Sequence, residues 1–179
     1  EAPIIEPQFL ETYLLSVFNI ETLVATKAAR VVGAACADGV ARGVIDFGSR
    51  RAHGPEAGVL AARAAYIGGC LGTSNVYAGR QFGIPVYGTM AHSWVEAFDS
   101  EEESFEKYHA VFPENTVLLV DTYDTVGCVR KVVKMPLREK LKGIRLDSGD
   151  LKMLSKKVRA ILDKAGLPRV KILASGNLN

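Results

Sequence analysis

Cysteine is scarce in this sequence, and its placement excludes two kinds of site. The three cysteines among 179 residues, Cys36, Cys70 and Cys128, lack the close spacing of metal ligands. Their odd number argues against the disulfide framework that small secreted proteins use. We therefore expect a cytoplasmic protein whose cysteines stay reduced.

Long hydrophobic runs are also missing. No apolar run reaches the roughly 18 residues that a membrane-spanning helix needs. The first residues, Glu-Ala-Pro-Ile-Ile-Glu-Pro, lack the charged and apolar regions of a signal peptide. We expect no contact with a membrane. Because the sequence does not begin with Met and stops after a polar stretch, we also expect both ends to be cut.

Neither sign of charge dominates the sequence. The 22 Lys and Arg residues nearly balance 20 Asp and Glu residues, which leaves a net charge of +2. This balance offers no general attraction for nucleic acid, although the pair Arg50 and Arg51 could hold a small anion. Since 48% of the residues are hydrophobic and no linker or repeat interrupts them, we expect one domain over residues 1–179 and a small-molecule ligand.

The sequence does contain a regular alternation of strands and helices. Apolar spacing predicts two helices at the start, separated by a break at Asn19. Later helices have predicted caps at Ser100 and Asp124, and an apolar helix face begins at Leu151. Six β-prone runs are predicted as strands: 43–47, 67–71, 84–87, 116–120, 144–146 and 170–174. This alternation predicts a parallel α/β sheet, either doubly wound or closed into a barrel.

Polar or glycine-rich residues follow every predicted strand. In parallel α/β folds, ligands bind at the carboxyl ends of the strands. The residue types found there suit anions, because arginines bind phosphate or carboxylate and small residues expose backbone N–H groups. Aspartates suit Mg²⁺ or sugar hydroxyls. The segments concerned are 47–51, 72–75, 88–93, 121–124, 145–150 and 175–177.

In order and spacing, these segments resemble the motif series of the nicotinate phosphoribosyltransferases. The residues that carry the resemblance are Asp46-Phe47-Gly48-Ser49-Arg50-Arg51, Gly72-Thr73-Ser74-Asn75, Gly88-Thr89-Met90-Ala91-His92-Ser93, Leu119-Val120-Asp121-Thr122-Tyr123-Asp124, Arg145-Leu146-Asp147-Ser148-Gly149-Asp150 and Ser175-Gly176. The resemblance implies an irregular (β/α) TIM-like barrel, incomplete over residues 1–179, beside a smaller α/β domain that is mostly absent. It also implies a homodimer or higher homo-oligomer.

The reaction implied by the resemblance joins nicotinate to phosphoribosyl pyrophosphate, giving nicotinate mononucleotide and pyrophosphate for NAD biosynthesis. Positive charge then develops on the sugar and negative charge on the departing pyrophosphate, so the site needs Mg²⁺ and hydrogen-bond donors. The residues that suit this work are Arg145, Asp147, Asp150 and Gly149. Mg²⁺ is expected to arrive with the substrates, and no set of protein metal ligands is predicted.

His92 is the implied phosphorylation site through which ATP hydrolysis assists the reaction. A neutral imidazole carries a lone pair near pH 7 and is therefore a good phosphoryl acceptor. The alternative is a histidine that only packs or hydrogen-bonds, which is the interpretation we give to His53 and His109.

Nicotinate recognition is expected from residues near the first two motifs. Phe47 can stack on the pyridine ring, and Arg50 or Arg51 can bind its carboxylate or the nucleotide phosphate. Ser74 is neutral where the related nicotinamide-using enzyme places an acid, which favours a carboxylate substrate. The resemblance implies further substrate contacts from Thr73, Thr89, Asp121, Ser148, Ser175 and Gly176.

Two other functions remain open from the sequence. One is a quinolinate phosphoribosyltransferase, which decarboxylates its substrate, needs no ATP and calls for a more basic site. The other is a barrel that binds a sugar phosphate without catalysis. His92 and the aspartates Asp147 and Asp150 argue against a binding protein, because binding alone requires none of them.

Overall fold

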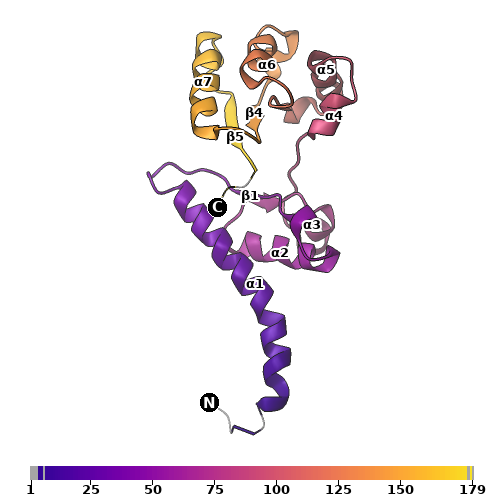
Figure 1. The fold of residues 1–179 in the computed structure, drawn as a ribbon, viewed down its shortest axis with the longest axis vertical. Helices are drawn as coiled ribbons and strands as arrows, with labels where there is room; N and C mark the ends of the chain where they lie inside the picture. Colours follow the sequence, from indigo (N-terminus) through magenta and orange to yellow (C-terminus); the bar gives the residue numbers. More distant parts are fainter. Residues whose placement is uncertain (1–3, 6, 177, 179) are drawn as a thin grey trace. The chain divides into compact units, whose positions relative to one another are not determined.

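The computed structural model describes residues 4–5, 7–176 and 178, and these divide into two compact units, Glu1–Gly88 and Thr89–Asn179. Asn177, which belongs to the last predicted strand-end segment, lies outside the described residues. Figure 1 shows helices and short strands alternating along the chain in both units. No described helix is both long and apolar enough to cross a membrane.

The first unit begins with one long helix, α1 (Gln8–Ala35), so the predicted break at Asn19 is wrong. No proline or glycine occurs between residues 8 and 32, and asparagine within a helix costs only a fraction of a kcal/mol. The later part of α1 packs against α2 (Pro55–Ile67), where Ala28 and Ala65 are buried with Cys70. At this crossing, a Cβ on Gly68 would lie 2.6 Å from the Ala25 carbonyl oxygen, so only glycine fits.

Two short parallel strands follow in the first unit. Strand β1 (Ile45–Asp46) pairs with β2 (Gly72–Thr73), and α3 (Val76–Phe82) comes after them. The strand predicted at 67–71 is wrong, because Ile67 ends α2 and the strand starts only after the Gly68-Gly69 turn. The strand predicted at 84–87 is reduced to a single parallel bridge between Val86 and Thr73.

The second unit holds a three-stranded parallel sheet in the order β3-β4-β5. The strands span Val117–Leu119, Gly143–Leu146 and Lys171–Ala174. Its longer helices are α5 (Glu101–Val111), α6 (Thr125–Val132) and α7 (Leu151–Lys164), and a short helix α4 (His92–Glu96) precedes them. The described residues also contain the 3₁₀ turns η1 (Ser49–Arg51), η2 (Pro113–Asn115) and η3 (Pro136–Lys140). Strands expected at 116–120, 144–146 and 170–174 are confirmed with small changes of boundary.

The core of the second unit forms around β3 and β4. Successive residues of β3 are all buried, which means that both faces of the strand are covered. Leu118 and Ile144 have no solvent exposure, and α6 and α7 contribute the buried Val129 and Leu162 to the same cluster. This burial explains why the strands read as continuous apolar runs in the sequence.

Helix capping in the second unit agrees with the sequence. The Ser100 hydroxyl accepts from the Glu103 amide at 3.1 Å, and the Asp124 carboxylate accepts from the Val126 amide at 3.2 Å. The parallel pairing of all five described strands confirms an α/β fold. A single (β/α) barrel domain over residues 1–179 stays a prediction.

Candidate active site

The polar groups of the second unit gather where its three strands end. Because β3, β4 and β5 are parallel neighbours in register, their carboxyl ends lie at one edge of the sheet. The ladder continues past the strands, since the Ser175 amide donates to the Leu146 carbonyl oxygen at 2.8 Å. Asp121, Asp147 and Ser175 therefore come together as predicted, and we call Thr89, His92, Asp121, Arg145, Asp147, Ser148 and Ser175 the strand-end cluster.

Asp121 is the central acceptor of the strand-end cluster. Its side chain is only 1% exposed. Oδ2 accepts from the Asp147 amide at 2.8 Å and from the Ser148 hydroxyl at 2.6 Å. Oδ1 lies 3.3 Å from Nε2 of His92. A buried carboxylate with these partners is well satisfied, and it ties the loop after β4 to the start of α4.

His92 is the first residue of α4, and its side chain is 38% exposed. An ionised carboxylate can only accept hydrogen bonds, so the contact with Asp121 favours the tautomer in which Nε2 carries the proton. In that tautomer the lone pair is on Nδ1. The arrangement orients the ring and leaves it partly open to solvent, as a nucleophile requires.

Arg145 is nearly buried, with 12% of its side chain exposed. Its Nε donates to the Ser175 hydroxyl at 2.8 Å, one terminal nitrogen donates to the Thr89 hydroxyl at 2.8 Å, and the other donates to Asp147 at 2.7 Å. The guanidinium thus connects the segment before α4 with the ends of β4 and β5. Its charge lies inside the strand-end cluster rather than on the protein surface.

The Asp147 carboxylate is held ionised by its neighbours. Burial alone would raise its pKa, but hydrogen bonds from Ser175 and Arg145, together with the nearby Arg145 charge, hold the pKa below its usual value. A Cβ on Gly176, whose φ is +112°, would lie 2.8 Å from the Asp147 carbonyl oxygen. Glycine at this position lets the chain after β5 approach the aspartate.

Asp150 has a structural contact that the sequence analysis did not predict. Its carboxylate accepts from the Met153 amide at 2.8 Å and so caps α7.

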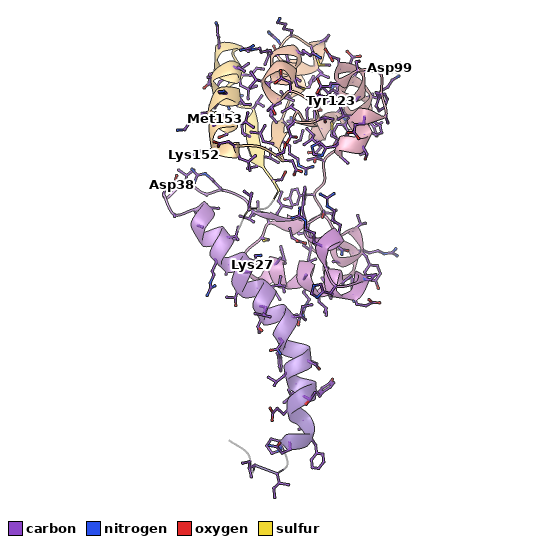
Figure 2. All side chains as sticks on the ribbon, in the orientation of Figure 1. Lys27, Asp38, Asp99, Tyr123, Lys152 and Met153 are labelled. Carbon is purple, nitrogen blue, oxygen red and sulfur yellow. The ribbon has the colours of Figure 1, made fainter. Side chains whose placement is uncertain are left out.

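Tyr123, labelled in Figure 2, is 68% exposed, so it does not pack into the core. Its neighbour Asp124 caps α6.

The residues predicted to recognise the base lie in the first unit. Arg50 and Arg51 are exposed on η1, and Phe47 just before them is 36% exposed. Thr73 is fully buried at the end of β2, and Ser74 follows it half-buried. Both loops contact Asp46, which the sequence analysis did not select. A carboxylate that ends a strand two residues before a glycine is the signal that could have identified it.

Among the residues that the structure describes, no group of three His, Cys, Asp or Glu side chains could hold an ion. The carboxylates of the strand-end cluster accept hydrogen bonds from protein groups.

Comparison with known proteins identifies close relatives. A family model described as the nicotinate phosphoribosyltransferase (NAPRTase) family matches residues 43–174. The chain is 50% identical to nicotinate phosphoribosyltransferase pncB2 of Mycobacterium tuberculosis over 99% of its length and 38% of that protein. It is 48% identical to the nicotinate phosphoribosyltransferase of Bacillus subtilis over its whole length and 36% of that protein.

The fold of the chain is also similar to solved structures. The chain superposes on human nicotinic acid phosphoribosyltransferase with a TM-score of 0.77 at 27% identity, covering 99% of this chain and 47% of the human one. It superposes on nicotinate-nucleotide pyrophosphorylase of Pyrococcus furiosus with a TM-score of 0.79 at 30% identity, covering 89% of this chain and 42% of that one. The chain thus spans less than half the length of the proteins that it matches.

Proposed function

The chain belongs to the nicotinate phosphoribosyltransferase family, and on this basis we propose that the whole protein joins nicotinate to phosphoribosyl pyrophosphate. The products are nicotinate mononucleotide, a precursor in NAD biosynthesis, and pyrophosphate. The observation that carries the proposal is the strand-end cluster, in which His92, Asp121 and Asp147 are linked by hydrogen bonds at one edge of the sheet. An irregular (β/α) barrel fold, a cytoplasmic location and a homo-oligomer are parts of the same proposal.

The glycosidic step needs charge stabilisation more than covalent chemistry. The bond between the anomeric carbon and the pyrophosphate oxygen breaks, its electron pair leaves with pyrophosphate, and the pyridine nitrogen forms the new bond. The Asp147 carboxylate, kept ionised by its neighbours, can stabilise the positive charge that develops on the sugar. The negative charge on the leaving pyrophosphate can be stabilised by Arg145, by the Gly149 amide and by Mg²⁺ bound to the phosphates.

His92 is the proposed phosphoryl acceptor that couples ATP to this step. In the reaction the bond between the γ-phosphorus and its bridging oxygen breaks, ADP takes the electron pair, and a ring nitrogen forms the new bond. The Asp121 contact at Nε2 makes Nδ1 the nitrogen with an available lone pair. Partial exposure of the ring supports access by ATP.

Recognition of nicotinate is assigned to the first unit. We propose that Phe47 stacks on the pyridine ring, that Arg50 or Arg51 binds the carboxylate, and that Ser74 accommodates this anion without repulsion. Ser74 and the two arginines lie on the loops after neighbouring strands, which supports a shared role. Remaining substrate contacts are proposed for Thr73, Thr89, Ser148, Asp150, Ser175 and Gly176.

A product assay tests the proposed function against its alternatives. The whole protein is incubated with phosphoribosyl pyrophosphate, Mg²⁺ and nicotinate, nicotinamide or quinolinate, each with and without ATP. We expect nicotinate mononucleotide, formed faster with ATP. Product from quinolinate with release of CO₂ would instead identify the decarboxylating enzyme, and binding without any product would identify a sugar-phosphate binding protein.

A further inference from the structure

Asp46 ends strand β1 and stands directly before the loop that carries Arg50 and Arg51. Its two carboxylate oxygens bind two different segments of the first unit. Oδ1 accepts from the Gly48 amide at 2.8 Å, and Oδ2 accepts from the Thr73 hydroxyl at 2.7 Å. The Asp46 carbonyl oxygen also accepts from the Ser74 amide at 2.8 Å. One residue therefore holds the loop after β1 and the loop after β2.

Asn75 joins the same two loops a second time. The backbone amide of Asn75 donates to the Thr73 hydroxyl at 3.0 Å, and its side-chain Nδ2 donates to the Ser49 hydroxyl at 3.2 Å. These hydrogen bonds, closed by the peptide bond between Gly48 and Ser49, form a ring of contacts. We call it the Asp46 ring, and it consists of Asp46, Gly48, Ser49, Thr73 and Asn75. The ring carries one charge, on Asp46.

The Asp46 ring extends a very short stretch of sheet. Strands β1 and β2 pair over only two residues each, so backbone hydrogen bonds fix little beyond Asp46 itself. Thr73 has no solvent exposure, and a hydrogen bond to an ionised acceptor is stronger than one between neutral groups. Ser49 directly precedes Arg50, and Ser74 lies between Thr73 and Asn75. The ring thus sets the position of Ser74 relative to the arginines.

We propose that Asp46 is a positioning residue for recognition of the nicotinate carboxylate, acting through the two loops that carry Arg50, Arg51 and Ser74. This inference rests on the proposed function, which assigns those side chains to the base. In this proposal the Asp46 carboxylate has no contact of its own with the base, and each of its oxygens accepts a hydrogen bond within the ring. Its effect is on binding and on the choice between a carboxylate and an amide.

The substitution Asp46→Asn tests this role with little change of shape. The remaining oxygen can still accept from Gly48, but the new amide is a donor and cannot accept from the Thr73 hydroxyl. We expect the KM for nicotinate to rise about tenfold or more, which is the effect of losing a hydrogen bond to a charged group. We expect kcat to change much less, and the preference for nicotinate over nicotinamide to fall.

The control and a second variant come from the same unit. Asp38, labelled in Figure 2 in the turn after α1, is exposed, and its carboxylate pairs with the Arg42 guanidinium at 2.6 Å. We expect Asp38→Asn to keep the wild-type KM. Thr73→Val removes the donor to Asp46 without altering the charge, so it replaces Asp46→Asn if that variant does not fold. In the double variant, the KM for nicotinate is expected to be no higher than in the more impaired of the two single variants.

Backbone amide exchange provides a readout that does not depend on catalysis. In Asp46→Asn, exchange at residues 47–52 and 74–75 should accelerate, whereas exchange at 117–120 in the other unit should not change. An unchanged KM for nicotinate overturns the proposal whether or not exchange accelerates. A raised KM with unchanged exchange also overturns it, because Asp46 would then act on the base directly. If wild-type protein makes no nicotinate mononucleotide, the proposed function fails, while the exchange data still show whether the ring holds the loops.

Discussion

Nε2 of His92 lies 3.3 Å from Oδ1 of Asp121, a carboxylate that is almost completely buried at the end of β3. Asp121 is fixed in turn by the Asp147 amide and the Ser148 hydroxyl. The histidine is thus oriented by a group that is itself held in place from the neighbouring strand.

Asp121→Asn should slow ATP-stimulated turnover by about 10² to 10⁴, because an amide no longer selects the tautomer with the lone pair on Nδ1. Turnover without ATP should fall less, since His92 has no part in it. Ser148→Ala serves as the matched variant, because it removes a donor to Asp121 and leaves the contact with His92 in place. Equal losses in the two variants would show that Asp121 only supports the loop after β4.

Ser74→Asp should weaken the use of nicotinate through charge repulsion. Two like charges about 4 Å apart cost about 1 to 4 kcal/mol at effective dielectric constants between those of water and a protein surface. The specificity constant for nicotinate is the quantity to measure. Ser155→Asp on α7 adds the same charge at a residue that is not assigned to the base and should leave the constant unchanged. An unchanged constant in Ser74→Asp would place its side chain away from the base.

Asp147 should stabilise the fold only when it is ionised. Its pKa in the folded protein lies below the usual value, so its contribution is complete above the unfolded pKa of about 3.9 and is lost as the pH falls through the folded pKa. Asp147→Asn should therefore destabilise the protein at pH 7 and show a smaller difference from wild type near pH 3. Urea unfolding midpoints across this range measure the effect, and a difference that does not depend on pH would contradict it.

Core packing around β3 gives a prediction about stability. Leu118 has no solvent exposure, and Leu118→Ala should lower the free energy of unfolding by about 2 to 5 kcal/mol through lost contacts and a cavity. Met153, labelled in Figure 2, is 46% exposed on α7, and Met153→Ala should change the free energy by less than about 0.5 kcal/mol. Denaturant unfolding of both variants checks the pair, and similar losses would mean that the core lies elsewhere.

The sequence predicted best where the apolar pattern was continuous and ended in polar residues. Val117–Leu119 and Asp121 are such a case, because burial on both faces leaves no alternative interpretation of the run. The prediction was less accurate at 67–71, because the chain turns at Gly68-Gly69 and the strand begins only at Gly72. The helix break at Asn19 failed because local propensity is weak beside the continuity of the long helix.

Side-chain partners were harder to predict than strand ends. Asp46 was not selected, since its role depends on Thr73, a residue 27 positions away. His109 was interpreted as a histidine that only packs or hydrogen-bonds, and its Nδ1 lies 2.6 Å from the Thr116 hydroxyl, a partner that the sequence did not identify. Such contacts depend on how elements pack, and the spacing of residue types within one element does not encode them.

In the strand-end cluster, His92 is the residue proposed to accept a phosphoryl group from ATP. The most direct measurement incubates the whole protein and its His92→Ala variant with γ-labelled ATP and tests for protein phosphate that is labile in acid and stable in base. We expect label in the wild type and none in the variant, which should keep slow synthesis of nicotinate mononucleotide without ATP because Arg145, Asp147 and Asp150 remain. Equal labelling of the two proteins would contradict the account and remove His92 from the reaction.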